Sequence, residues 1–175
     1  PIEAQWHIVL ELTDSIRRED LGDLLAECLL EHGFDSAVLA QSENERQLFW
    51  TLRENISASQ RKLGASIKHD IALPIAAVST FIADCAPRLQ AAFADIDIVV
   101  FGHLGDGSLH YNTFLPQVLS NEVYQYEDKI NSIVYESVLK YEGTIAAEHG
   151  IGQVKNHWLP HVRSEAEIAL MRAIK

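Results

Sequence analysis

Hydrophobic and polar residues follow two periods along the chain, one of two residues and one of about 3.6. Alternating or β-rich apolar runs predict extended segments or strands at residues 6–13, 37–40, 66–72, 96–101, 109–115 and 144–147. Helical spacing predicts helices at residues 18–32, 42–64, 74–93 and 120–142, and from 164 onward. Capping boxes at Ser42–Glu45 and Ser164–Glu167, Pro74 and Gly143 supply the helix boundaries.

The order of these elements predicts an α+β fold. Strands 96–101 and 109–115 follow one another directly, whereas helices connect most of the others. This order favours an antiparallel or mixed sheet with helices packed on one face, as in a ferredoxin-like cap domain, over a doubly wound parallel sheet. Residues 1–175 contain no repeat and no long linker, so we expect one domain. The chain opens in strand-like sequence and stops in helix-like sequence, so we expect truncation at both ends.

Composition narrows the classes of partner. A formal net charge of -11 argues against nucleic acid, and 47% hydrophobic with 22% charged residues is typical of a soluble globular protein. The longest apolar stretch, residues 71–83, is too short to span a bilayer. Cys28 and Cys85 lie in apolar helical contexts, which predicts buried free thiols and a reducing cytoplasm.

Two glycine-bracketed histidine motifs form a candidate metal and acid/base site. In Gly-His-Leu-Gly-Asp-Gly-Ser-Leu-His (102–110), a hairpin would place His103 and His110 at the same end of paired strands. In an unbroken strand, their spacing would put them on opposite faces. Glu148 and His149 enter a second glycine-rich turn, where one side chain can bind metal while its neighbour faces the substrate.

Each of these residues also has a simpler interpretation. The histidines could be polar turn residues bonded to the backbone, and Glu148-His149 could be a surface pair. Asn112 shares a strand face with His110 and could contact a ligand. Arg53 could bind a carboxylate from a helix, and Lys68 lies in an extended segment, but the residues alone favour a solvated surface position for both. The glycine-rich loops match no Walker or dinucleotide fingerprint.

Four motifs in order give the chain a family resemblance. It resembles the C-terminal substrate domain of the FAD-linked oxidases, which include D-lactate and D-2-hydroxyglutarate dehydrogenases and the D-type subunit of glycolate oxidase. The resemblance covers most of the chain from about Glu45 onward. Its motifs are Phe-Trp-Thr-Leu-Arg-Glu-Asn-Ile-Ser (49–57), Lys-His-Asp-Ile-Ala-Leu-Pro (68–74), the 102–110 motif and Glu-His-Gly-Ile-Gly (148–152).

The resemblance implies a flavin-dependent D-2-hydroxy-acid dehydrogenase, which oxidises its substrate to the 2-oxo acid with hydride transfer to FAD. FAD would be bound mainly by an N-terminal domain that is absent here. By position, the ligands of a zinc or manganese ion would be His103, His110 and Glu148. His149 would be the catalytic base, and the substrate would be bound by Arg53, Ser57, Lys68 and Asn112.

The resemblance also implies partners. They are a small 2-hydroxy acid, the chain's own FAD-binding domain and an electron acceptor, which could be a quinone, a cytochrome or an electron-transfer flavoprotein. A homodimer and a place at the periphery of the inner membrane are compatible with it. Ser108 departs from the asparagine common in the family, and the family's usual Asp-Pro…Asn-Pro-Gly segment is not reached. We expect the isolated chain to be inactive. Two other classes stay open: a metal-dependent hydrolase and a non-catalytic ligand-binding domain.

Overall fold

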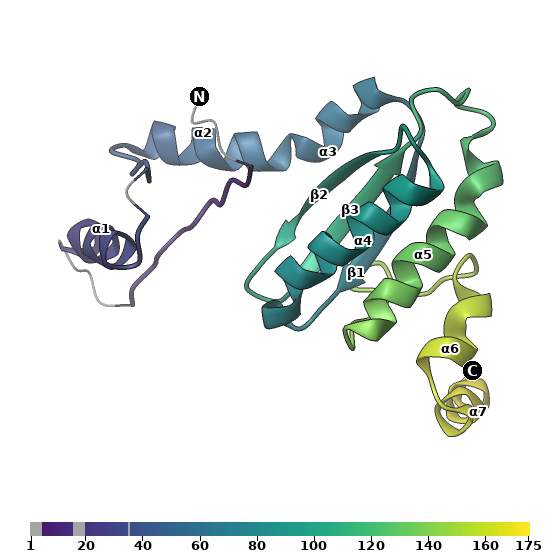
Figure 1. The fold of residues 1–175 in the computed structure, drawn as a ribbon. Coiled ribbons are helices and arrows are strands. Elements are labelled where there is room, and N and C mark those ends of the chain that lie inside the picture. The colour runs from purple at the N-terminus through teal and green to yellow at the C-terminus, as the bar shows by residue number, and fades with distance from the viewer. Residues whose placement is uncertain (1–4, 16–19, 35) are drawn as a thin grey trace. The chain divides into compact units, whose positions relative to one another are not determined.

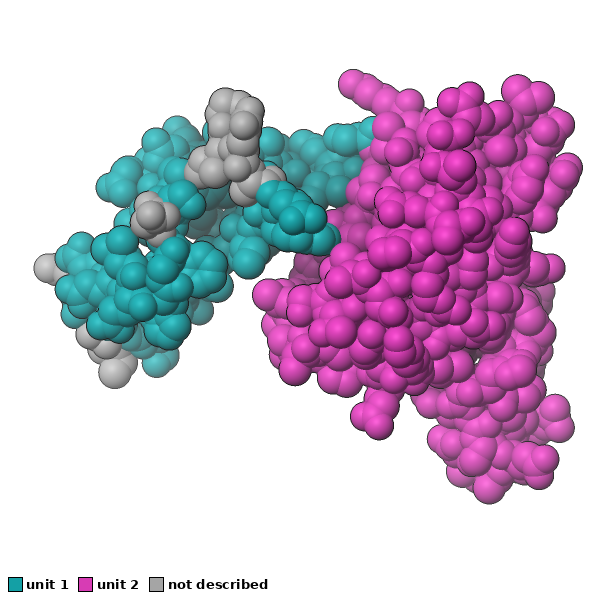
Figure 2. Space-filling view, viewed as in Figure 1, with its two compact units in different colours: residues 1–59 teal, residues 60–175 magenta. Residues whose placement is uncertain are grey.

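The computed structural model describes residues 5–15, 20–34 and 36–175. The chain divides into two compact units, Pro1–Ser59 and Gln60–Lys175 (Figure 2). The expectation of a single domain over residues 1–175 stays a prediction.

The first unit is helical where it is regular. Its helices are α1 (Leu21–Glu31), α2 (Glu43–Glu54) and the short α3 (Ile56–Ser59). The predicted cap of α2 is present, because the Ser42 hydroxyl accepts from the backbone N–H of Glu45 at 3.3 Å. The helix predicted over residues 42–64 is divided at Asn55 and ends in a 3₁₀ turn at Gln60–Leu63. The predicted start of the first helix at Arg18 lies outside the described residues.

Three expectations for this unit are wrong. Residues 6–13 and 37–40 do not form the predicted strands, because a strand needs a hydrogen-bonded neighbour and the described residues of this unit are helical or irregular. Cys28 was expected to be buried but is exposed. Cys28 is not an exception, because none of the described residues of this unit is buried. Its exposed apolar side chains include Trp6, Ile8, Leu10, Leu12, Leu48 and Leu52.

The second unit is built on a three-stranded antiparallel sheet in the order β1-β3-β2 (Figure 1). The strands are β1 (Ser66–Ala72), β2 (Asp97–His103) and β3 (Ser108–Phe114). They confirm the strands predicted at 66–72, 96–101 and 109–115 and the hairpin between the last two. Gly107 lies in that hairpin at φ 75°, where a Cβ would stand 1.9 Å from the carbonyl oxygen of Leu73.

Two helices, α4 (Val78–Ala92) and α5 (Glu127–Lys140), cover one face of this sheet (Figure 1). Each is preceded by a 3₁₀ turn, at Ile75–Ala77 and Val123–Tyr126. Phe81 of α4 contacts Tyr111 of β3 edge to face, with ring centroids 5.5 Å apart. The architecture therefore confirms an α+β fold with helices on one face. The core also contains Ile67, Ile71, Cys85, Leu89, Ile130, Val134 and Val138.

The segment after α5 follows the outer edge of β1. It was predicted to form a strand at residues 144–147, but only one bridge forms, between Thr144 and Ala72. The chain ends in α6 (Leu159–Val162) and α7 (Glu165–Ile174), after a 3₁₀ turn at Asn156–Trp158. α7 begins with the predicted capping box between Ser164 and Glu167. Among the described residues, every helix is too short or too polar to cross a bilayer.

Candidate functional site

Side chains that alternate with the core residues give the sheet a polar face, opposite the face that α4 and α5 cover. Ile67, His69 and Ile71 of β1 are buried, so Lys68 and Asp70 between them point to the other side. The register places Lys68 opposite Asn112 and Asp70 opposite His110 on β3. We define the polar face by the residues Lys68, Asp70, His110, Asn112, Phe101 and His103.

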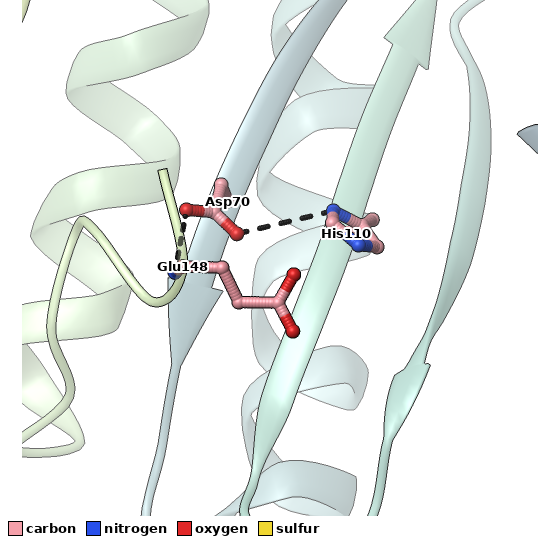
Figure 3. Close-up of side chains that lie close together, drawn as sticks. All are labelled: Asp70, His110 and Glu148. Carbon is pink, nitrogen blue, oxygen red and sulfur yellow. Dashed lines mark hydrogen bonds and ion pairs between the residues drawn. The ribbon is translucent and has the colours of Figure 1, made fainter. Parts of the chain in front are cut away.

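Asp70 connects three parts of this face. One carboxylate oxygen, Oδ2, accepts hydrogen bonds from the backbone N–H groups of Glu148 and His149, at 2.9 and 2.8 Å. The other, Oδ1, lies 3.9 Å from Nδ1 of His110 (Figure 3). This single side chain therefore joins β1, β3 and the turn that carries Glu148 and His149.

The surroundings of Asp70 favour its charged form. Burial raises the pKa of the Asp70 carboxyl, but the backbone N–H groups of His149 and Glu148, together with nearby positive charge, bring that pKa below its ordinary value. Lys155 adds to this charge, and its ammonium donates to the carbonyl of Ile145 at 2.7 Å. Asp70 is thus a buried carboxylate that is kept ionised.

Asp70, His110 and Glu148 form a cluster whose ligand atoms all lie within 4.8 Å of one another. Glu148 extends its carboxylate toward the strand that carries His110 (Figure 3). The neighbouring His149 has a side chain that is 70% exposed, with Nδ1 3.9 Å from Oδ2 of Asp70 and a ring centroid 5.8 Å from that of His110. One imidazole and two carboxylates are donors that suit zinc or manganese. The cluster therefore fits a divalent ion and leaves His149 accessible beside it.

Two of the three predicted metal ligands lie close together in the structure. His110 and Glu148 come together, and Asp70 takes the third position in the cluster found among the described residues. His103 lies at the exposed end of β2, opposite Ser108 and on the same face as His110. The two histidines thus share a face as expected, but they are not paired across the strands, since His110 lies opposite Phe101. The assignment of His103 as a ligand stays a prediction.

The predicted substrate contacts divide between the units. Lys68 is exposed beside Asn112, whose side-chain amide is buried and donates from Nδ2 to Oε1 of Gln60 at 2.8 Å. Arg53 in α2 and Ser57 in α3 belong to the first unit. Their contact with substrate stays a prediction.

Sequence reasoning missed Asp70 and Gln60. For Asp70 a signal was present, because it is two residues after Lys68, on the same face of the predicted strand, and falls within a motif already noted at 68–74. Gln60 lies in a polar helical stretch, where nothing in the sequence distinguishes it from its neighbours.

The chain thus combines an α+β fold with a carboxylate–histidine cluster and an accessible histidine on one face of its sheet. Over residues 1–175 it matches the C-terminal domain of the FAD linked oxidases. The chain belongs to this family.

Similar proteins include two bacterial ones named D-2-hydroxyglutarate dehydrogenase. The chain is 34% identical to that of Xanthomonas citri pv. viticola, over 97% of this chain and 36% of the relative. It is 35% identical to that of Stutzerimonas stutzeri, over 94% and 36%. The mitochondrial D-2-hydroxyglutarate dehydrogenase of Arabidopsis thaliana is 35% identical, over 97% and 30%. The chain thus spans about a third of the length of these relatives.

Proposed function

We propose that the chain is the substrate-binding domain of a flavin-dependent dehydrogenase that oxidises a D-2-hydroxy acid to the 2-oxo acid. The observation that carries the proposal is the meeting of His110 and Glu148 beside the accessible His149 on the polar face. Family membership and relatives named D-2-hydroxyglutarate dehydrogenase support it.

The substrate carboxylate would be bound by the basic residues. Lys68 is exposed on the polar face next to the Asp70–His110 pair, so its ammonium is available to a small anion that reaches the cluster. Asn112 would supply an amide contact once it exchanges its bond with Gln60. Arg53 and Ser57 would complete the contacts to the carboxylate and to the rest of the substrate.

A zinc or manganese ion would be held by His110 and Glu148, with His103 as the third ligand that we propose. When bound, such an ion lowers the pKa of a coordinated hydroxyl. The turn at Glu148–His149 then separates two tasks, because Glu148 points into the cluster whereas His149 stands beside it.

His149 would take the hydroxyl proton as the α-hydrogen leaves with its electron pair. FAD, when bound, supplies the acceptor for that hydride. The proton and the hydride together account for the two hydrogens that the hydroxy acid loses in becoming the 2-oxo acid. The wide exposure of the His149 ring leaves room for the substrate carbon and the flavin to approach from outside this unit.

The test is anaerobic reduction of the flavin in the full-length holoenzyme on mixing with D-2-hydroxyglutarate or D-lactate. Reduction is measured as the loss of visible flavin absorbance. His149→Ala should slow reduction by about 10² to 10⁴, the usual value of general-base assistance, with FAD still bound. His157→Ala is the matched control, because it removes an exposed imidazole elsewhere in the same unit. Reduction by His149→Ala at the wild-type rate would contradict the role of His149.

Metal analysis of the same proteins tests the ligands. We expect about one zinc or manganese per chain, lost on dialysis from His110→Ala and from His103→Ala. Retention by His103→Ala with loss from His110→Ala would remove His103 from the ligand set. A fully active enzyme without metal would refute the metal assignment and leave the dehydrogenase proposal standing.

The remaining parts of the proposal concern partners and location. Reoxidation of the flavin would use a quinone, a cytochrome or an electron-transfer flavoprotein, and we propose a cytoplasmic site for the enzyme. Steady-state assays with each acceptor and cell fractionation address these points. Hydrolytic activity without flavin would favour the metal-dependent hydrolase, and binding of hydroxy acids without turnover would favour the ligand-binding domain.

A further inference from the structure

We propose that Asp70 is a positioning residue, which fixes the Glu148–His149 turn and orients His110. The inference deepens the proposed function and rests on it for the roles of Glu148, His110 and His149. It assigns to Asp70 no contact with substrate, no proton transfer and no bond to the metal, although its carboxylate lies within the cluster.

The first observation is the convergence of three consecutive backbone N–H groups on one residue. Ala147 donates to the main-chain carbonyl of Asp70 at 3.3 Å, and Glu148 and His149 donate to its carboxylate. The adjacent Thr144 and Ala72 exchange two backbone hydrogen bonds, at 2.8 and 3.0 Å. The segment therefore starts as a partner of β1 and is then turned by the Asp70 side chain, which explains why no full strand forms there.

The second observation is the strength expected of these bonds. Both donors meet the carboxylate of an Asp70 side chain that is 7% exposed, and charge-assisted hydrogen bonds are about twice as strong as neutral ones. The turn that follows contains Gly150 and Gly152 at positive φ and has no helix or strand of its own. Its position at Glu148 and His149 thus depends on Asp70 to a large degree.

The third observation concerns His110. Oδ1 of Asp70 faces Nδ1 of this ring at 3.9 Å, so the carboxylate constrains the side of the ring that it faces. A histidine that binds metal through one nitrogen commonly has a carboxylate near the other, which fixes its tautomer and ring orientation. One carboxylate would thus set both the imidazole and the turn that carries the second ligand and the base.

The experiment compares Asp70→Asn and Asp70→Ala in the full-length holoenzyme with Asn131→Ala. The control residue is a buried polar one on the opposite, helix-covered side, where Asn131 Oδ1 lies 2.9 Å from His69 Nε2. Three quantities are measured: amide hydrogen exchange of the peptide containing Glu148 and His149, metal content after dialysis, and kcat and KM for reduction of the flavin.

We expect exchange in that peptide to accelerate about tenfold or more in Asp70→Ala, since two hydrogen bonds to a charged group are lost. Misplacement of the base should lower kcat by about 10², with a smaller change in KM because the carboxylate-binding residues are intact. In Asp70→Asn the amide oxygen can still accept from both N–H groups. The amide nitrogen, however, presents an N–H donor to His110 where the carboxylate presents an acceptor. The variant should therefore lose metal affinity by about 10–100-fold with a smaller change in exchange.

Exchange and kcat in both Asp70 variants equal to those of Asn131→Ala would overturn the inference. Failure of the proposed function and failure of the role given to Asp70 would be seen in different measurements. A wild-type enzyme whose flavin no D-2-hydroxy acid reduces would refute the proposed function. Exchange in the peptide does not depend on catalysis, so an unchanged rate in Asp70→Ala would still refute the role of Asp70.

Discussion

The buried imidazole of His69 should make the stability of the chain depend on pH. The residue is 1% exposed, with Nδ1 2.8 Å from the carbonyl oxygen of Tyr111 and Nε2 2.9 Å from Oδ1 of Asn131. Burial lowers the pKa of His69 to about 4, even though both hydrogen-bond neighbours act to raise it. The ring is therefore neutral in the folded chain at pH values where the unfolded chain would protonate it.

The direction in which the free energy of unfolding changes with pH follows from the state that binds a proton at His69. Above a pH of about 6.5, the ordinary pKa of histidine, neither state is protonated at His69 and the residue imposes no penalty. As the pH falls from about 6.5 to about 4 the unfolded state gains a proton that the folded state does not, so the free energy of unfolding decreases. Below about 4 both states are protonated and the loss stops. Between pH 7 and pH 5 the expected loss is about 2 kcal/mol.

The assay is equilibrium urea unfolding of the chain at pH 7 and pH 5, followed by circular dichroism, for the wild type and for His69→Leu. The substitution lowers stability at both pH values, because it removes the hydrogen bond that the neutral ring donates. Only the pH-dependent difference is diagnostic, and it should be about 2 kcal/mol smaller in His69→Leu, since other titrating groups are common to both proteins. An equal difference would refute the reasoning. A larger one would mean that the two acceptors hold His69 protonated.

Two further predictions concern packing and thiol exposure. Gly107→Ala should destabilise the chain by about 2–5 kcal/mol, because the new Cβ would meet the Leu73 carbonyl at a positive φ. The control Gly105→Ala has open space around it and should change the urea midpoint little; equal midpoints for the two variants would contradict the hairpin geometry. In native protein a thiol reagent should modify exposed Cys28 and leave buried Cys85 unmodified until urea is added. Rapid native labelling of Cys85 would mean that the core opens.

The sequence predicted the second unit well because its signals are local. Period-two alternation around Lys68 and Asp70, the proline at residue 74 and the glycines of the 102–110 hairpin each define an element without reference to distant residues. The same alternation at residues 6–13 predicted a strand that the structure does not contain. Strand formation depends on a partner, and a single segment of sequence does not contain that information.

The candidate site was predicted only in part for a related reason. The hairpin brought His103 and His110 to one face by local geometry, and the family resemblance supplied Glu148 and His149. The role of Asp70 depends on the β1–β3 register and on hydrogen bonds to residues 78 and 79 positions later in the chain. Contacts between residues so far apart in the chain arise from the folded arrangement and are not evident from the local sequence.

The strand β1 has a consequence for how enzymes of this kind can diversify. Its odd-numbered residues Ile67, His69 and Ile71 lie in the core, and the even-numbered Lys68 and Asp70 lie in the candidate site. Inserting or deleting one residue would exchange the two sets, putting charge in the core and hydrocarbon in the site at once. The length of this strand is therefore under double constraint, and we expect changes of substrate preference to arise in the loops and in the helices outside the sheet.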